Sequence, residues 1–374
     1  MPDVVVLQRR IPHYRVDLFE QLFARFGWAI AASPDAKSPQ GPAFYYYPMP
    51  EERRFGRTVV AVPLARILTE LKPKAVIAEY SFKMTSTWDL IAGRWTRGLR
   101  ILFWSHGYNM SRGFRTASDL AHQFMRGAVA RLADGHVCYS EEGYQFLTRF
   151  VPRERLFIAH NTMKGPDPPP AVRPRSSGGP RLLSISRLTP GKSVDRLLAI
   201  FQSFKSRFPE SRLTMVGGGT EIDFLRGLAE PLGDAVTFTG EITDHDRLAA
   251  LFQAADCFVI SGDAGLSVNH ALLHGVPVVL FERCTDGPFH GPEHAYVQDG
   301  ITGIRVKKHT DEAFVAALIS LFTSSPDPKY QFHNAIHCFA SKYLNIDRMI
   351  EDFGKVDLYL KALATQRGSS VDTQ

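Results

Sequence analysis

The 374-residue sequence lacks the features that would set it apart from ordinary globular proteins. No stretch reaches the roughly 18 uninterrupted apolar residues of a membrane-spanning helix. No basic segment precedes the first apolar run, so we expect no signal peptide and a cytoplasmic protein. The four cysteines have no paired spacing, which favours buried or unreactive thiols over a disulfide framework. They are Cys138, Cys257, Cys284 and Cys338.

A metal site is not predicted either. Among the 13 histidines, His290 and His294 lie on either side of Glu293, but no third ligand follows at a diagnostic spacing. The segment Asp244–Asp246 looks like the paired-aspartate metal motif of some sugar-nucleotide enzymes. It directly precedes an apolar helical pattern, however, so capping of that helix is the better explanation. We therefore expect no bound metal.

Basic residues gather in the first half of the chain. Residues 1–165 hold 23 lysines and arginines against 14 aspartates and glutamates, a net charge of +9, which leaves −3 for the remainder. Such a surface suits an anionic partner such as phospholipid, a lipid-linked diphosphate or nucleic acid, and a merely solvated surface is the alternative. The arginine clusters are Arg9-Arg10-Arg15, Arg53-Arg54-Arg57, Arg94-Arg97-Arg100 and Arg112-Arg115-Arg126.

Apolar runs and helix-like segments alternate through both halves, which indicates two parallel sheets. In the first half we expect strands at Val4–Gln8, Val59–Val62, Ala75–Ala78, Ile101–Trp104 and Gly135–Cys138, with helices such as Arg15–Phe26 and Ser118–Arg131. In the second half we expect strands at Arg181–Ile185, Arg212–Val216, Ala235–Phe238, Cys257–Ile260 and Val276–Phe281, and helices at Ser193–Phe208, Ile222–Leu232 and Asp246–Ala254.

The length and this alternation together predict two domains. Residues 1–165 form the first, and residues 166–180, dense in proline and glycine, are a linker. Residues 181–345 form the second domain, and residues 346–374 are a helix that returns to the first domain, with a tail. We expect two doubly wound α/β domains that face each other across a cleft, with ligands at the carboxyl ends of the strands.

Three loops of the second half suit an anionic ligand. Arg187 and Lys192 flank a Pro-Gly turn that opens a helix, an arrangement that fits a diphosphate. Gly217 and its two glycine neighbours either admit a ligand to the backbone or merely turn the chain. After the strand at Cys257–Ile260, free backbone N–H groups at Gly265 and the next two residues begin a helix, where an anion is the usual ligand.

In this order the motifs resemble a known family. From Arg181 to Arg305 the sequence is similar to the nucleotide-binding half of retaining GT-B glycosyltransferases of the GT4 type. The matching segments are SRLTPGK, LTMVGGG, VTFTGEI, LFQAADCFV, GLSVNHALLHGVPVV and VQDGITGIRV. The first half matches more weakly, through FWSHG and IAHNT. The resemblance implies the GT-B fold, with two Rossmann-like domains, and a nucleoside-diphosphate sugar as co-substrate without any other cofactor.

The resemblance also implies roles for individual residues. Arg187 and Lys192 would neutralise the departing diphosphate, and His106 would contact the donor sugar near its reacting carbon. The implied donor-binding residues are Gly217, Gly218, Glu241, Ile242, Asp263, Gly265, Leu266, Ser267, His270 and Glu293. Asn161 and Thr162 match a domain-junction motif and are expected to be structural.

One part of the family pattern is missing. Typical members carry two glutamates eight positions apart, and this chain has Gly262 and His270 in their places. His270 could still bond the ribose, and Glu293 could return a carboxylate from the next loop. The pattern of His270 followed by the Pro292-Glu293 pair resembles that of a bacterial subgroup of the family. This resemblance favours an active variant over an inactive enzyme.

The acceptor side is expected at the end of the first strand. Family members often show paired glycines there, whereas this chain has QRRIPHYR. Arg9, Arg10, His13 and Arg15 are therefore assigned to an anionic acceptor, with an outward-pointing Arg15 as the alternative.

We thus predict a metal-independent retaining hexosyltransferase. It would move a sugar from a nucleoside-diphosphate sugar to a hydroxyl of a glycan or lipid-linked glycan in bacterial surface polysaccharide synthesis, with peripheral contact to the inner face of the membrane. Two alternatives stay open. A GT-B-fold epimerase would need acid and base carboxylates, for which Asp263 and Glu293 are candidates. A non-enzymatic protein that binds nucleic acid or an anionic surface would explain the charge, although no nucleic-acid motif accompanies it.

Overall fold

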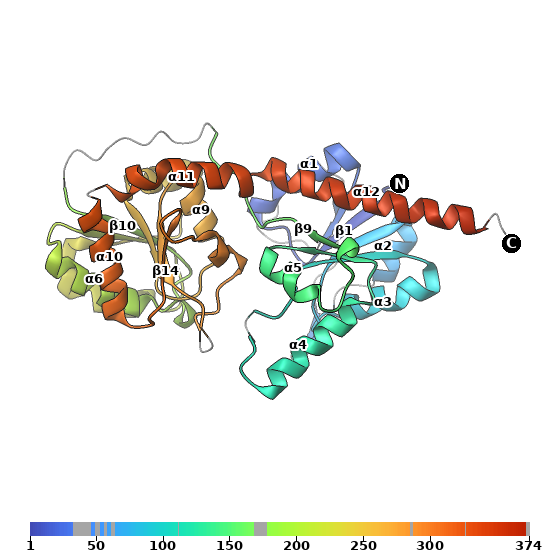
Figure 1. Ribbon diagram of the computed structural model, residues 1–374, viewed down its shortest axis with the longest axis horizontal. Coiled ribbons are helices and arrows are strands. Elements are labelled where there is room, and N and C mark those ends of the chain that lie inside the picture. Colours follow the sequence, from blue (N-terminus) through green and yellow to red (C-terminus); the bar gives the residue numbers. More distant parts are fainter. Residues whose placement is uncertain are drawn as a thin grey trace. The chain divides into compact units, whose positions relative to one another are not determined.

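The computed structural model describes the chain except for residues 33–45, 49–52, 56–57, 61–63, 111, 168–177, 285–286, 326 and 372–374. The chain divides into two compact units. The first comprises Met1–Lys164 together with Ile346–Gln374, and the second comprises Gly165–Asn345. Each unit has its own parallel sheet flanked by helices (Figure 1).

The first unit is built on a seven-stranded parallel sheet. Its strands, in spatial order, are β3 (Tyr46–Pro48), β2 (Ala29–Ala32), β1 (Val4–Gln8), β6 (Ala75–Glu79), β7 (Arg100–Ser105), β8 (Gly135–Cys138) and β9 (Leu156–Ile158). Its helices are α1 (Val16–Phe26), α2 (Leu64–Leu71), α3 (Thr85–Arg97), α4 (Ala117–Ala130), α5 (Glu141–Leu147) and α12 (Ile346–Val371), with 3-10 turns η1 (His13–Arg15) and η2 (Arg153–Arg155). Alternate β1 residues enter two separate apolar clusters, so both faces of the sheet are buried, which explains its continuous apolar run.

Two details of this sheet differ from the prediction. The strand expected at Val59–Val62 is wrong as a member of the parallel sheet, because β5 (Thr58–Val60) pairs antiparallel with β4 (Arg53–Phe55) in a separate two-stranded sheet. Positions 61 and 62 lie outside the described residues. Strands β2 and β9 were not expected, because an alanine-rich segment and a three-residue segment give little periodic signal.

The second unit has a six-stranded parallel sheet. Its strands, in spatial order, are β12 (Val236–Gly240), β11 (Arg212–Val216), β10 (Arg181–Ile185), β13 (Cys257–Ile260), β14 (Val278–Phe281) and β15 (Gly303–Val306). Its helices are α6 (Val194–Arg207), α7 (Ile222–Ala229), α8 (His245–Ala254), α9 (Ser267–Leu273), α10 (Asp311–Ser324) and α11 (Pro328–Tyr343), with 3-10 turns η3 (Pro190–Lys192), η4 (Glu230–Ala235) and η5 (Pro292–Tyr296). Every β14 residue is buried, as expected of a central parallel strand.

The predicted α/β, doubly wound architecture is confirmed in both units. The first strand of each unit lies inside its sheet, with β1 between β2 and β6, and β10 between β11 and β13. The direction in which strands are added therefore reverses beside β1 and beside β10. Loops diverge at such a point, so the carboxyl ends of these strands are where ligands are expected. The predicted arrangement of the two domains across a cleft stays a prediction.

The last helix, α12, belongs to the first unit. The indole N–H of Trp28 donates to Asp357 Oδ1 at 3.2 Å, and the hydroxyl of Tyr359 donates to the carbonyl oxygen of Asp134 at 2.7 Å. The buried ring of Phe353 contacts Trp28 edge-on. Helix α12 is thus part of the core of the first unit. Within the described residues, none of the helices combines the length and apolarity needed to cross a membrane.

Candidate functional site

The basic turn from Arg187 to Lys192 lies at the carboxyl end of β10. Lys192 closes η3 and is partly buried, and its ammonium group donates to the carbonyl oxygen of Asp263 at 2.6 Å. Asp263 follows β13, which neighbours β10 in the sheet. Two loops 71 positions apart in the chain thus meet through one charged hydrogen bond, because parallel strands end at the same edge of the sheet.

Charged side chains from three loops act on Lys192 here. Burial lowers the pKa of Lys192, and the nearby guanidinium of Arg187 lowers it further. The carboxylates of Asp263 and Glu293 oppose this and raise the Lys192 pKa. An entering anion would act in the same direction as these carboxylates and hold the ammonium group protonated. The structure therefore brings together the predicted residues of the basic turn, the β13 loop and the β14 loop.

Gly262 has a packing role that explains the missing glutamate. A Cβ atom at this position would overlap the main-chain carbonyl group of Lys192. The adjacent Ser261 hydroxyl donates to the carbonyl oxygen of Ser193 at 2.6 Å, which also holds the loop after β13 against the loop after β10. Since a side chain at position 262 would push the basic turn away, this chain cannot carry the family glutamate there with these loops in place.

Of the three glycines after β11, two pack closely against neighbouring main chain and one is open. Gly217 has a φ of +136°, and a Cβ atom on it would overlap the carbonyl oxygen of Ser186. A Cβ atom on Gly219 would overlap the carbonyl oxygen of Leu188. Gly218, by contrast, has open space around its Cα. Gly217 and Gly219 therefore seat this loop against the loop after β10, and only Gly218 has room for a ligand.

His290 ties the β13 loop to the β14 loop. Its Nδ1 accepts the amide N–H of Ala264 at 3.0 Å, so Nε2 carries the proton and donates to the carbonyl oxygen of Phe281 at 2.9 Å. The amide N–H of Phe289 donates to Asp263 Oδ1 at 2.6 Å. Glu293 is 3% exposed and holds its carboxylate against Gly291. From the sequence, His290 was considered only as a metal ligand, because its hydrogen-bond partners lie on other segments of the chain.

The His290 arrangement predicts a dependence of stability on pH. Burial lowers the pKa of His290 to about 3. Burial likewise lowers the pKa of His294, whose ring stacks on that of His290 with 4.6 Å between the ring centres. The folded chain keeps His290 neutral, whereas the unfolded chain binds a proton below about pH 6.5. The contribution of neutral His290 to the free energy of unfolding is therefore fully present above pH 6.5 and is lost as the pH falls from 6.5 towards 3.

We expect the unfolding free energy of the second unit to drop by about 2 kcal/mol between pH 7 and pH 5 from His290 alone. Denaturant unfolding followed by circular dichroism measures this difference. The His290→Gln variant removes the titrating group and should show a correspondingly smaller drop. An unchanged drop in the variant would show that His290 does not titrate in this way.

The remaining predicted donor residues lie at neighbouring strand ends. Glu241 and Ile242 follow β12, and Gly265, Leu266 and Ser267 form the start of α9. In the part of the chain that the structure describes, no hydrogen bond uses the amides of these last three residues as donors. The ring of His270 lies 5.9 Å from that of Phe252 on α8. The ligand contacts of all five residues and of His270 stay predictions.

The segment Asp244–Asp246 caps a helix, as predicted. The side chain of Asp244 accepts the amide N–H of Arg247 at 2.8 Å at the start of α8. Among the residues that the structure describes, no group of three or more histidine, cysteine, aspartate or glutamate side chains is placed to hold a metal ion.

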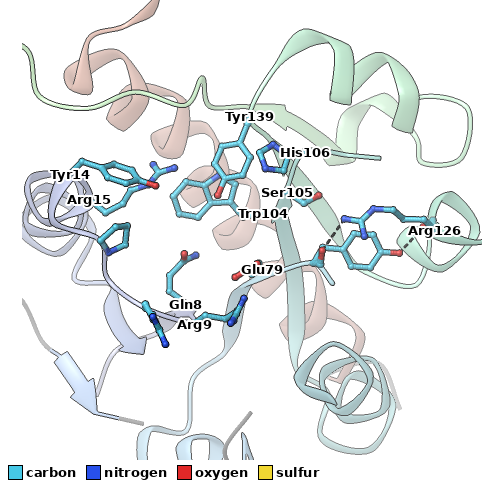
Figure 2. A pocket seen from close by; sticks show the side chains of 13 residues that line it. Gln8, Arg9, Tyr14, Arg15, Glu79, Trp104, Ser105, His106, Arg126 and Tyr139 are labelled. Atoms are coloured by element: carbon cyan, nitrogen blue, oxygen red, sulfur yellow. Dashed lines mark hydrogen bonds between the residues drawn. The ribbon is translucent and has the colours of Figure 1, made fainter. Parts of the chain in front are cut away.

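The first unit contains a pocket of about 450 Å³ at the carboxyl ends of β1, β6, β7 and β8. Gln8, Arg9 and Glu79 form one side, and Trp104, His106 and Tyr139 form the opposite side (Figure 2). The other lining residues are Arg10, Pro12, Tyr14, Arg15, Tyr80, Ser105 and Arg126. Three of the four predicted acceptor residues thus share one pocket with the predicted catalytic histidine, and His13 is not in the described lining.

Arg15 is held by the protein itself. Its guanidinium bonds to the side-chain oxygen of Asn161 and lies over the ring of Trp104, 4.7 Å from its centre. The residue is 4% exposed. These contacts give Arg15 and Asn161 a structural role, which was expected for Asn161 but not for Arg15. The outward-pointing alternative for Arg15 is wrong, and its contact with an acceptor stays a prediction.

His106 is positioned by close backbone packing and by a buried arginine. Gly107 has a φ of +80°, and the carbonyl of His106 lies so near Gly143 that a Cβ atom there would overlap it. The guanidinium of Arg126, on α4, donates to the carbonyl oxygens of Gly107 at 3.0 Å and Tyr80 at 2.9 Å. It also lies over the Tyr80 ring (Figure 2). Arg126 therefore ties the loops after β6 and β7 together.

Comparison with known proteins shows that the loops of the second unit are similar to those of a known family. Residues 179–324 match the model of the glycosyl transferases group 1 family, and this range contains the basic turn, Asp263 and Glu293. Most of the second unit is thus similar to a group 1 glycosyltransferase domain. The chain is 35% identical over 180 residues to a GDP-mannose-dependent phosphatidylinositol monomannoside mannosyltransferase of Mycolicibacterium smegmatis, covering 44% of each chain.

Other relatives resemble this glycosyltransferase domain or its fold. Mannosylfructose-phosphate synthase of Agrobacterium fabrum is 33% identical over 115 residues, covering 27% of this chain and 25% of the relative. The chain thus spans less than half the length of these curated relatives. Sucrose-phosphate synthase of Thermosynechococcus elongatus has a TM-score of 0.70 at 17% identity, covering 98% of this chain and 100% of that one.

A structure of HepE from Anabaena in complex with UDP also has a TM-score of 0.70, at 13% identity, with coverage of 95% and 99%. These likenesses extend over both units. The fold is therefore that of the GT-B glycosyltransferases, as the sequence resemblance implied.

Proposed function

We propose that the protein is a retaining glycosyltransferase that uses a nucleoside-diphosphate sugar and a glycan or lipid-linked glycan acceptor. The convergence of Arg187, Lys192, Asp263 and Glu293 at the carboxyl ends of β10, β13 and β14 carries this proposal. All four lie in the range that matches the glycosyltransferase family. Related proteins are described as GDP-mannose-dependent or as bound to UDP, which supports a nucleoside-diphosphate sugar as the donor class.

The chemistry follows from where charge develops. When the bond between the sugar and the diphosphate breaks, negative charge grows on the departing phosphate oxygens. The ammonium of Lys192 and the guanidinium of Arg187 neutralise that charge, and the amides at the start of α9 donate to the remaining oxygens. Since these cations and amides can balance the diphosphate charge, the proposed mechanism assigns no step to a metal ion.

Glu293 takes over the task of the missing family carboxylate. Position 262 is closed to a side chain by the main chain of Lys192, whereas the buried carboxylate of Glu293 lies near enough to raise the Lys192 pKa. In this proposal Glu293 accepts hydrogen bonds from hydroxyls of the donor sugar. His270, on α9, bonds the ribose of the nucleotide.

The pocket of the first unit suits the acceptor. Arg9, Arg10 and His106 all line this pocket, so an acceptor that carries a phosphate or other anionic group would be favoured there. A lipid-linked diphosphate glycan at the inner face of a bacterial membrane has this chemistry. We therefore infer a role in surface polysaccharide synthesis.

A thermal-shift panel tests the donor class. UDP, GDP, dTDP, CMP and a short oligonucleotide are added separately to the full chain. By mass action, a ligand at about 100 times its dissociation constant adds about 2.7 kcal/mol to stability. Selective stabilisation by one nucleoside diphosphate is expected. Stabilisation by the oligonucleotide alone would instead favour a nucleic-acid-binding protein.

His106→Ala is expected to lower the transfer rate about 100-fold, because in this proposal the imidazole, which lines the pocket, contacts the reacting sugar. Binding of the nucleoside diphosphate, which occupies the second unit, should change less than about twofold. Single-turnover assays with the donor found by the panel give the rate, and titration calorimetry gives the affinity. A variant that transfers at the parent rate would remove His106 from the proposed active site.

A further inference from the structure

Helix α4 exposes an apolar face. Leu120, Phe124 and Met125 are 54%, 66% and 53% exposed, and Ala117 and Ala121 on the same side are exposed as well. We call these five residues the α4 face. The single acidic residue of α4, Asp119, is 7% exposed and lies off this face. A solvent-facing helix surface without any charge is unusual, since exposed helix faces normally carry the polar residues.

Arginines flank this face at both ends of the helix. Arg112 and Arg115 precede α4, and Arg131 follows it, and none of the three is buried. Arg112 bonds to Asp119 at 2.7 Å, which uses the one carboxylate of the helix. Residues 112–132 thus carry four arginines and one aspartate, a net charge of +3. Exposed apolar side chains framed by arginine are the combination that binds the surface of an anionic bilayer.

Helix α7 offers an internal comparison. It also exposes a phenylalanine and a leucine four positions apart, Phe224 at 58% and Leu228 at 44%. That pair, however, lies among acidic residues, since residues 221–230 hold Glu221, Asp223 and Glu230 against Arg226. An anionic surface would repel this segment. The charge around each exposed pair, and not its apolarity, distinguishes α4 from α7.

The opposite side of α4 lines the pocket of the first unit. Arg126 points into the protein and contributes to the pocket wall, whereas Leu120, Phe124 and Met125 point outward. Helix α4 runs along the outside of the first unit (Figure 1). A bilayer seated on the α4 face would therefore lie about one helix diameter, roughly 10 Å, from the pocket.

We propose that the α4 face is a docking surface for anionic phospholipid bilayers. Leu120, Phe124 and Met125 enter the region between the headgroups and the acyl chains, and Arg115 and Arg131 contact lipid phosphates. The docking itself does not depend on the proposed transferase activity. Its use, to present the pocket to a lipid-linked acceptor, rests on that proposed function.

Vesicle flotation with matched variants tests this surface. Phosphatidylcholine vesicles with and without phosphatidylglycerol are mixed with the parent protein, with Leu120→Glu/Phe124→Glu, and with the control Phe224→Glu/Leu228→Glu. The parent should bind the anionic vesicles, less so at high salt. The α4 variant should lose about tenfold or more in partition coefficient, and the α7 control less than about twofold. Both variants should stay near the parent melting temperature and keep its shift with the nucleoside diphosphate, because all four positions are exposed and the α4 variant loses only the edge-on contact of Phe124 with Phe150.

Three results would overturn the docking surface. The first is that the parent binds no anionic vesicles, and the second is that the two variants lose binding equally. Alternatively, sedimentation could reveal a parent dimer that only the α4 variant dissociates, which would give the face to a second copy of this chain. None of these results bears on the thermal-shift panel, which contains no lipid, so failure of docking and failure of the transferase proposal can be told apart.

Discussion

Replacement of Lys192 by alanine should lower turnover about 100- to 1,000-fold, the usual cost of one preorganised charge that stabilises a developing anion. The ammonium group is already held at the carboxyl end of β10 by the carbonyl oxygen of Asp263. It therefore needs no reorientation when charge appears on the departing diphosphate. The substitution removes this one group and leaves the turn in place, because the turn is held by main-chain bonds such as the one from the Lys192 amide to Thr189.

The fold should survive this change. One partly exposed hydrogen bond is lost, which costs about 1 kcal/mol. Lys205, partly buried near the end of the following helix α6, provides a matched control, and Lys205→Ala should transfer at the parent rate. Initial rates with the donor identified by the thermal-shift panel measure both variants. Near-normal transfer by Lys192→Ala would count against a diphosphate at the basic turn.

Arg126→Met should destabilise the first unit by about 3 kcal/mol, because it leaves two main-chain acceptors unsatisfied and removes a ring contact. The guanidinium donates to the carbonyl oxygens of Gly107 and Tyr80 and lies 4.1 Å from the centre of the Tyr80 ring. Methionine keeps most of the volume of the stem, so the loss reports the guanidinium and not a cavity. Since Gly107 follows His106, transfer should fall as well.

Two variants separate this effect from a change of charge. Arg131→Met removes an exposed arginine just beyond the same helix and should cost less than about 0.5 kcal/mol. Arg126→Lys keeps the charge but cannot reach both carbonyl groups, so its stability should fall between those of the parent and Arg126→Met. Thermal and denaturant unfolding of the full chain measure all three. Equal stabilities for Arg126→Met and Arg131→Met would show that the buried contacts contribute nothing.

The sequence predicted the bounds of several short, mainly apolar strands correctly. The predicted bounds of β1, β8, β10, β11 and β13 match those observed. The prediction for β5 was wrong, because a short β-branched run has the same local pattern whether it joins the parallel sheet or a small hairpin. Pairing partners are set by tertiary contacts, which local periodicity does not record.

The charges and the order of the motifs in the sequence predicted only part of the site. Arg187, Lys192 and Asp263 could be placed together, because loops that follow parallel strands meet at one edge. The steric role of Gly262 could not be foreseen, since it depends on the main chain of Lys192, 70 positions earlier. Arg126 was seen only as one of several basic residues, because its partners come from two other loops.

The most direct test of the account is the structure of the protein with the nucleoside diphosphate that stabilises it most. The account predicts that a phosphate oxygen lies within hydrogen-bond distance, about 3 Å, of Lys192 Nζ, with the α9 amides facing the same group. A diphosphate bound instead among the arginines of the first-unit pocket, with Lys192 untouched, would contradict it.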